Sequence, residues 1–118
     1  MTAPYHVILW TIRFDTRMIY IDDDIHCERD GPFASFGEAI TELRRRAAIP
    51  WDSAPNRAPC TSWRKCGRKY NVLEFDTSCE QWKLLREVAV LNISANGVEW
   101  VDGFEQRWET GNSVNRGR

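Results

Sequence analysis

The chain has 118 residues, 42% of them hydrophobic and 28% charged, which indicates one globular domain and excludes a wholly disordered chain. Its formal net charge is −1 and its pI about 6.1, so a domain that is basic throughout, as nucleic-acid-binding domains usually are, is disfavoured. The first residues lack a basic start and an unbroken apolar run, and no segment reaches the length of a membrane span. We therefore expect a cytoplasmic protein with reduced thiols and no membrane partner.

Two strands are predicted near the start of the chain. Residues 5–14 are rich in β-branched and aromatic side chains, and residues 17–21 continue this pattern after a short turn, so the two segments are expected to form a hairpin. The following residues, 22–33, are acidic and end in the turn signal Asp-Gly-Pro, which predicts a connection rather than a strand.

Residues 35–48 give the clearest helix signal. Ser35 and Glu38 have the spacing of a capping box, which satisfies amide groups at a helix start. An apolar stripe with helical spacing follows, formed by Phe36, Ala39, Ile40, Leu43 and Ala47. Pro50 is expected to end the helix, because a proline cannot continue it and disfavours helical geometry in the residue before it.

A long loop is expected over residues 50–69, ordered by its three prolines and its Trp and Cys content. Residues 70–75 then predict a strand. Residues 77–88 predict a second helix, with a capping box at Thr77 and Glu80.

The last part of the domain predicts a hairpin. Residues 90–94 and 98–101 are separated by Asn96-Gly97, a strong turn signal because both residues tolerate positive φ. Phe104 and Trp108 are expected to pack a final turn against the body.

The expected architecture is an α+β two-layer sandwich. Its sheet is mostly antiparallel, its element order is ββα-loop-βαββ, and its two helices cover one face. The domain should span residues 1–109, including the basic loop of residues 50–69, and residues 110–118 should form a flexible tail.

Charge is concentrated in residues 44–70. This stretch holds eight Lys or Arg and one acid, whereas the rest of the chain holds eight cations and sixteen acids. Arginine offers bidentate hydrogen bonds to carboxylate or phosphate, and tryptophan offers a stacking face or an interface anchor. The partner-binding residues predicted on this basis are Trp51, Arg57, Trp63, Arg64, Lys65, Arg68, Lys69 and Tyr70.

We therefore expect a small binding module without enzymatic activity or a cofactor. It would dock an anionic partner, preferably an acidic protein surface in the manner of an inhibitor or immunity protein, with nucleic acid as the alternative. A structural loop with a solvated charged rim is the competing interpretation.

The four cysteines leave several interpretations open. Cys60 and Cys66 are spaced C-x5-C, and together with Cys27 and His26 they are candidates for a zinc site, although paired zinc ligands are usually closer in sequence. A Cys60–Cys66 disulfide is a second alternative. The favoured interpretation is four reduced cysteines, largely buried.

Enzymatic activity is disfavoured by the absence of a catalytic motif and by the presence of only two histidines. An enzyme would have to use Cys66, the acids at 22–24 or Glu74. Neighbouring cations would favour a Cys66 thiolate, but the acids around His26 would raise its pKa and make it a poor base. The same three acids lack the spacing of a calcium loop.

Overall fold

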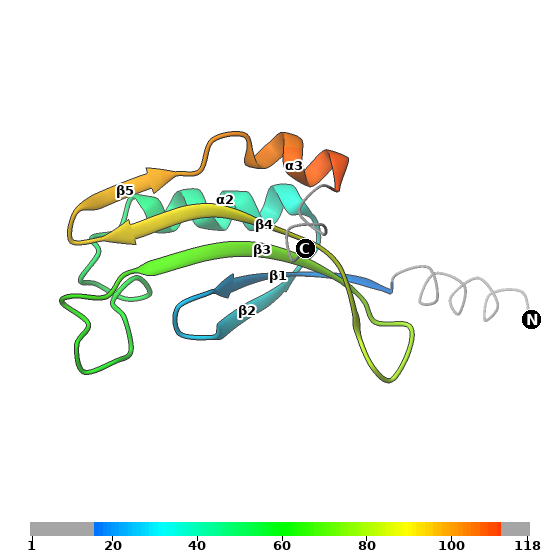
Figure 1. Cartoon of the computed structure of the whole chain (residues 1–118), viewed down its shortest axis with the longest axis horizontal. Helices are drawn as coiled ribbons and strands as arrows, with labels where there is room; N and C mark the ends of the chain where they lie inside the picture. Colours follow the sequence, from blue (N-terminus) through cyan, green and yellow to red (C-terminus); the bar gives the residue numbers. More distant parts are fainter. Residues whose placement is uncertain (1–15, 112–118) are drawn as a thin grey trace, which may run out of the picture.

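The computed structural model describes residues 16–111, which form one antiparallel sheet and two helices (Figure 1). The strands are β1 (Arg17–Asp23), β2 (Glu28–Phe33), β3 (Arg68–Asp76), β4 (Lys83–Ser94) and β5 (Gly97–Trp100), and they lie in the order β2-β1-β3-β4-β5. The helices are α2 (Phe36–Ala47) and α3 (Phe104–Thr110). The predicted α+β two-layer fold with a largely antiparallel sheet is confirmed. The strand expected at residues 5–14 and the end of the expected tail, residues 112–118, lie outside the described residues.

The hydrophobic core lies between the helices and one face of the sheet. Ile21 of β1, Val72 of β3 and Val90 of β4 are each at most 1% exposed and lie against Leu43 of α2, which is fully buried. Helix α3 packs beside α2, since Phe36 stacks on Trp108 with ring centroids 4.3 Å apart. None of the helices in residues 16–111 is long and apolar enough to cross a membrane.

Helix α2 begins where the sequence predicts. The Ser35 hydroxyl accepts a hydrogen bond from the Glu38 amide at 3.1 Å, and the Glu38 carboxylate accepts one from the Ala34 amide at 3.3 Å. Ala39, Ile40 and Leu43 are buried, so the predicted apolar stripe is the face that packs on the sheet.

The predicted helix at residues 77–88 is wrong, because strand β4 begins at Lys83. Thr77 does not cap a helix, since its amide and hydroxyl both donate to the Thr16 carbonyl at 2.7 Å. Strand β4 pairs with β3 from Asp76 back to Arg68 and buries Val88 and Val90 in the core. This pairing outweighs the helical spacing of the local sequence. The second helix of the fold is instead α3, at the position where the sequence predicts only a final turn.

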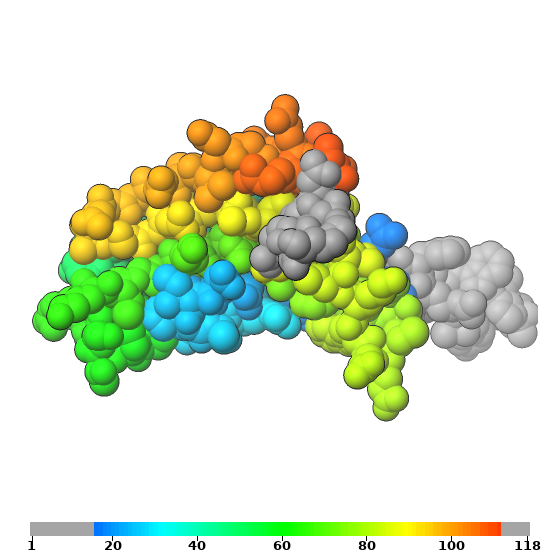
Figure 2. Space-filling model, in the orientation of Figure 1, coloured from blue at the N-terminus to red at the C-terminus, as the bar shows by residue number. Residues whose placement is uncertain are grey.

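Strand β2 was not predicted, because five of its six residues are exposed and it carries no apolar alternation. It forms one edge of the sheet and pairs only with β1. Gly31 adopts φ +137°, and a Cβ atom there would lie 2.9 Å from the Tyr20 ring, so only glycine fits this part of the pairing. The connection 24–27 between β1 and β2 lies beside the long loop at one end of the molecule (Figure 2).

Candidate functional site

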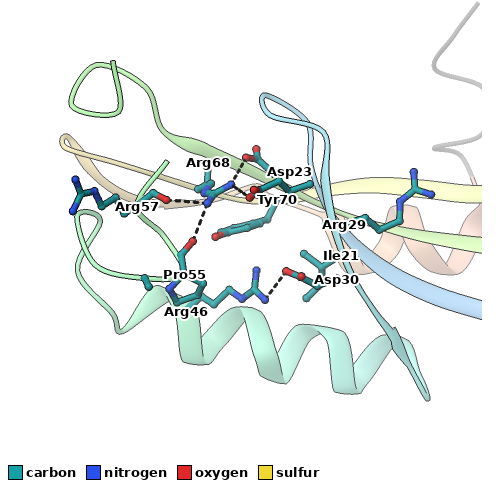
Figure 3. A pocket seen from close by; sticks show the side chains of 11 residues that line it. Ile21, Asp23, Arg29, Asp30, Arg46, Pro55, Arg57, Arg68 and Tyr70 are labelled. Carbon is teal, nitrogen blue, oxygen red and sulfur yellow. Dashed lines mark hydrogen bonds and ion pairs between the residues drawn. The ribbon is translucent and has the colours of Figure 1, made fainter. Parts of the chain in front are cut away.

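Arg68, the first residue of β3, joins the long loop to strands β1 and β2 (Figure 3). Its Nη1 atom donates to Asp23 Oδ2 at 2.8 Å and to Glu28 Oε1 at 2.6 Å. Its other nitrogens donate to three carbonyl groups of the loop at 2.9–3.2 Å, those of Pro55, Asn56 and Arg57. The Arg68 side chain is only 7% exposed, so this cation is an internal support of the loop.

Asn56 fastens the loop to the end of α2. Its Nδ2 atom donates to the Arg46 carbonyl at 2.8 Å, which also accepts from the Ile49 amide at 3.0 Å, and to the Ile49 carbonyl at 2.9 Å just past the helix end. Its Oδ1 atom accepts from the Tyr70 hydroxyl at 3.2 Å. Asn56 is 2% exposed, so all of these bonds are shielded from water.

Asp23 is the electrostatic centre of the network. Besides Arg68, its carboxylate accepts hydrogen bonds from the amides of Ile25 and Lys69, both at 3.1 Å, and from His26 Nδ1 at 2.7 Å. Burial alone would raise the pKa of Asp23, but the bonds from Arg68, His26 and the amides outweigh burial and lower it. An ionised carboxylate only accepts, so His26 Nδ1 carries a proton and the neutral ring keeps its lone pair on Nε2.

His26 Nε2 is buried and has no hydrogen-bond partner in the described part of the chain. It belongs to a cluster with Cys60 and Cys66, in which the ligand atoms of all three residues lie within 4.8 Å of one another. The two sulfur atoms are 3.0 Å apart. The hydrogen bond from Cys66 is the main cause that lowers the pKa of Cys60 to about 7, and the same bond raises the pKa of Cys66. Burial lowers the pKa of His26, but the hydrogen bond to Asp23 and the nearby Cys60 thiol outweigh burial and raise it.

A tight turn holds the two cysteines together. The Ser62 carbonyl accepts from the Lys65 amide at 2.8 Å and from the Cys66 amide at 3.2 Å, which folds residues 62–66 back on themselves. The Ser62 hydroxyl lies 3.6 Å from each sulfur atom. The turn therefore holds the two thiols and the Ser62 hydroxyl together, and the two thiols lie beside the imidazole of His26.

The loop around this turn carries exposed cations. Arg57 and Arg64 place their guanidinium groups 4.2 Å and 4.5 Å from the centre of the Trp63 ring. Trp63 in turn contacts Trp51, with ring centroids 5.5 Å apart, and Trp51 packs against the core. We call the following set the loop cation surface: Arg57, Trp63, Arg64, Lys65 and Lys69. Its four cations are exposed and form no ion pair with the described residues.

A hollow of about 410 Å3 lies beside Arg68 and is lined by charges of both signs (Figure 3). Arg46 donates to Asp30 at 2.9 Å and to Glu42 at 2.7 Å, and Arg68 is paired as described above. The acidic strands β1 and β2 thus neutralise part of the basic stretch 44–70. The hollow offers few unpaired cations to an anion, whereas the loop cation surface offers four.

The predicted binding residues divide into two groups. Arg57, Arg64, Lys65 and Lys69 are exposed and Trp51 and Trp63 are half-buried, but Arg68 and Tyr70 are 6% and 2% exposed and lie inside. Sequence reasoning missed the roles of Asn56 and Asp23. A lone asparagine in a proline-rich loop carries no local signal for a contact with a helix end.

Three of the four predicted zinc candidates come together, namely His26, Cys60 and Cys66. Cys27 is exposed and does not join them. The expectation of largely buried cysteines is wrong, since Cys27 and Cys79 are exposed and the other two are half-buried. All four are free thiols in the structure.

The residues proposed for an enzyme are divided between two places, since Cys66 and Asp23 both lie beside His26, whereas Glu74 lies elsewhere in the sheet. The Asp23 carboxylate accepts hydrogen bonds from four donors, and Glu74 accepts from Arg86 at 2.8 Å within the sheet.

Comparisons with protein families, with curated proteins and with solved structures each find no match for this chain.

Proposed function

We propose that the protein is a small non-enzymatic binding module that docks an acidic protein surface, in the manner of an inhibitor or immunity protein, through the loop cation surface. The observation that supports this proposal is the arrangement at Trp63, where two exposed guanidinium groups flank one indole ring. Both arginines are exposed, and neither forms an ion pair with an acidic side chain of the described residues.

Stacking prepares these arginines for recognition. A guanidinium group held over an indole face is restricted in its rotamers, while its N–H edge stays available to a carboxylate. Trp51 supports the ring from the core side. Because the loop is already fastened by Arg68 and Asn56, a partner has to order few groups when it binds, which favours affinity.

A protein partner is favoured over nucleic acid by the overall charge. Glu28 and Asp30 of β2 lie beside the basic stretch 44–70, where they pair with Arg68 and Arg46, and the net charge is −1. The phosphates of a nucleic acid would be repelled by these acids. Binding that neutralised several phosphates would also weaken steeply with added salt. Nucleic-acid binding is the second candidate function, because the Trp63 ring could stack on a base. The experiment below distinguishes a protein partner from a nucleic acid.

The proposal is tested by charge reversal with a matched control. The double variant Arg64→Glu/Lys65→Glu is compared with Arg17→Glu/Lys83→Glu, which makes the same change in net charge at the other end of β3, roughly 27 Å away. Each immobilised protein is used to capture binding proteins from a lysate treated with nuclease, and captured proteins are identified by mass spectrometry.

The proposal expects an acidic protein that is retained by the wild type and by the control and lost by Arg64→Glu/Lys65→Glu, with the melting temperature of both variants nearly unchanged. Equal capture by all three proteins would refute it. Binding that disappears with nuclease and is restored by a single-stranded oligonucleotide would instead establish the nucleic-acid alternative.

A further inference from the structure

We propose that His26, Cys60 and Cys66 form a zinc site that clamps the loop turn to the β1–β2 connection. The inference stands independently of the docking proposal, because metal binding is measured without a partner. Its basis is the buried Nε2 atom of His26, which has no partner among residues 16–111 and lies with two thiols in a cluster within 4.8 Å.

The donor set suits zinc. Two thiolates and one imidazole are borderline-soft ligands that favour Zn2+ over Mg2+ or Ca2+, which prefer oxygen. Three protein ligands leave the fourth tetrahedral position for a water molecule. Two thiolate charges and a neutral imidazole balance the ion. Binding therefore releases the thiol protons of Cys60 and Cys66 to solvent.

Asp23 prepares the imidazole. Its carboxylate holds His26 Nδ1–H at 2.7 Å and is itself fixed by Arg68 at 2.8 Å, so the ring orientation is set by buried groups. A carboxylate behind a ligating histidine is the usual arrangement around zinc, because it selects the tautomer and raises the basicity of the ligating nitrogen. Asp23 is thus a positioning residue and His26 the ligand.

The turn provides the remaining adjustment. Zinc–sulfur bonds of about 2.3 Å in tetrahedral geometry separate two sulfur atoms by about 3.8 Å. The two thiols stand 3.0 Å apart, so the ion has to move them apart by a little under 1 Å. Both cysteines lie on half-buried loop positions at the two ends of a short turn, where such a shift requires no movement of the core.

The first experiment uses the full chain, purified with reductant and titrated with Zn2+ and Co2+ at neutral pH. The wild type is expected to bind one zinc ion, and its cobalt form should show thiolate charge-transfer absorption and tetrahedral d–d bands. Cys60→Ser, Cys66→Ser and His26→Gln should each weaken zinc binding by more than the roughly 10–100-fold typical for loss of an outer-shell group. Cys27→Ser and Cys79→Ser, which change exposed cysteines outside the cluster, should bind as the wild type does.

A second measurement needs no variant and so does not depend on whether substitutions fold. Zinc should protect Cys60 and Cys66 of the wild type from alkylation and leave Cys27 and Cys79 reactive, as mapped by mass spectrometry. Absence of bound zinc, or equal protection of all four thiols, would overturn the proposal. A Cys60–Cys66 disulfide that forms in the purified protein and excludes zinc would also overturn it and would identify a redox pair instead.

Discussion

Replacing Asn56 with alanine should destabilise the protein by about 3 kcal/mol. The substitution removes one hydrogen bond to the Arg46 carbonyl, which keeps its bond from the Ile49 amide, the bond to the Ile49 carbonyl, and the acceptor of the Tyr70 hydroxyl. Each lost hydrogen bond costs about 1 kcal/mol in net terms, and a buried group left without a partner costs at least as much. For a domain of this size, 3 kcal/mol corresponds to a fall in melting temperature of about 12 °C or more.

The assay is equilibrium unfolding in guanidinium chloride, with the denaturation midpoint compared at constant slope. Asn96→Ala, which changes an exposed asparagine in the β4–β5 turn, is the control and should stay within about 0.5 kcal/mol of the wild type. A double-mutant cycle with Tyr70→Phe should give a coupling of about 1 kcal/mol, because both single variants remove the same bond. A loss below about 0.5 kcal/mol for Asn56→Ala would refute the role of this residue in fastening the loop.

Three further predictions concern the framework around the site. Glu42, whose pKa is lowered to about 2 chiefly by the hydrogen bond from Arg45, contributes stability that is present above pH 4.5 and lost as the pH falls toward 2. Because the Arg45 partner of Glu42 is exposed to solvent, Glu42→Gln should cost only about 0.5–1 kcal/mol at neutral pH and clearly less at pH 2, as measured by urea unfolding at both values; an equal loss at both would contradict the ion pair. Thr77→Val should cost about 1 kcal/mol, since it removes the hydrogen bond from the hydroxyl to the Thr16 carbonyl, whereas Glu80→Ala should leave stability unchanged. A lower melting temperature for Glu80→Ala than for Thr77→Val would instead support the helix cap predicted from the sequence. Gly31→Ala should cost more than Gly97→Ala, by about 2 kcal/mol, because both glycines have positive φ but only Gly31 has atoms within 3 Å of the added methyl group; equal losses would show that the β1–β2 pairing yields freely.

The sequence predicted those elements whose local signals agree with their tertiary surroundings. Helix α2 has both a cap at Ser35 and an apolar stripe, and the β4–β5 hairpin has an Asn-Gly pair, although the two turn residues are Ala95 and Asn96 and Gly97 already pairs with Ser94. The prediction of a helix at residues 77–88 is wrong because the helical spacing of this segment competes with pairing to β3, which has a strand partner along its whole length. Strand β2 was not predicted because an exposed edge strand needs no alternation of apolar and polar residues.

The candidate site could be predicted only in outline. The concentration of cations in residues 44–70 is visible in the sequence, but whether each cation is free depends on the fold. Arg68 meets Asp23 across 45 positions of the chain, whereas Arg64, within residues 16–111, meets only the ring of its neighbour Trp63. His26 and the cysteines were candidates by residue type alone. Their juxtaposition follows from the return of the loop across the β1–β2 connection, which no local pattern encodes.

The central claim is that the loop of residues 50–67 is fixed in the free protein and so preforms both the cation surface and the thiol–imidazole cluster. The most direct measurement is the backbone order parameter from 15N NMR relaxation of the free, metal-free protein. Values near 0.85 at Asn56, Arg57 and Cys66, comparable with those of β3, are predicted from the bonds that hold these residues. Values below about 0.6 across the loop would contradict the claim.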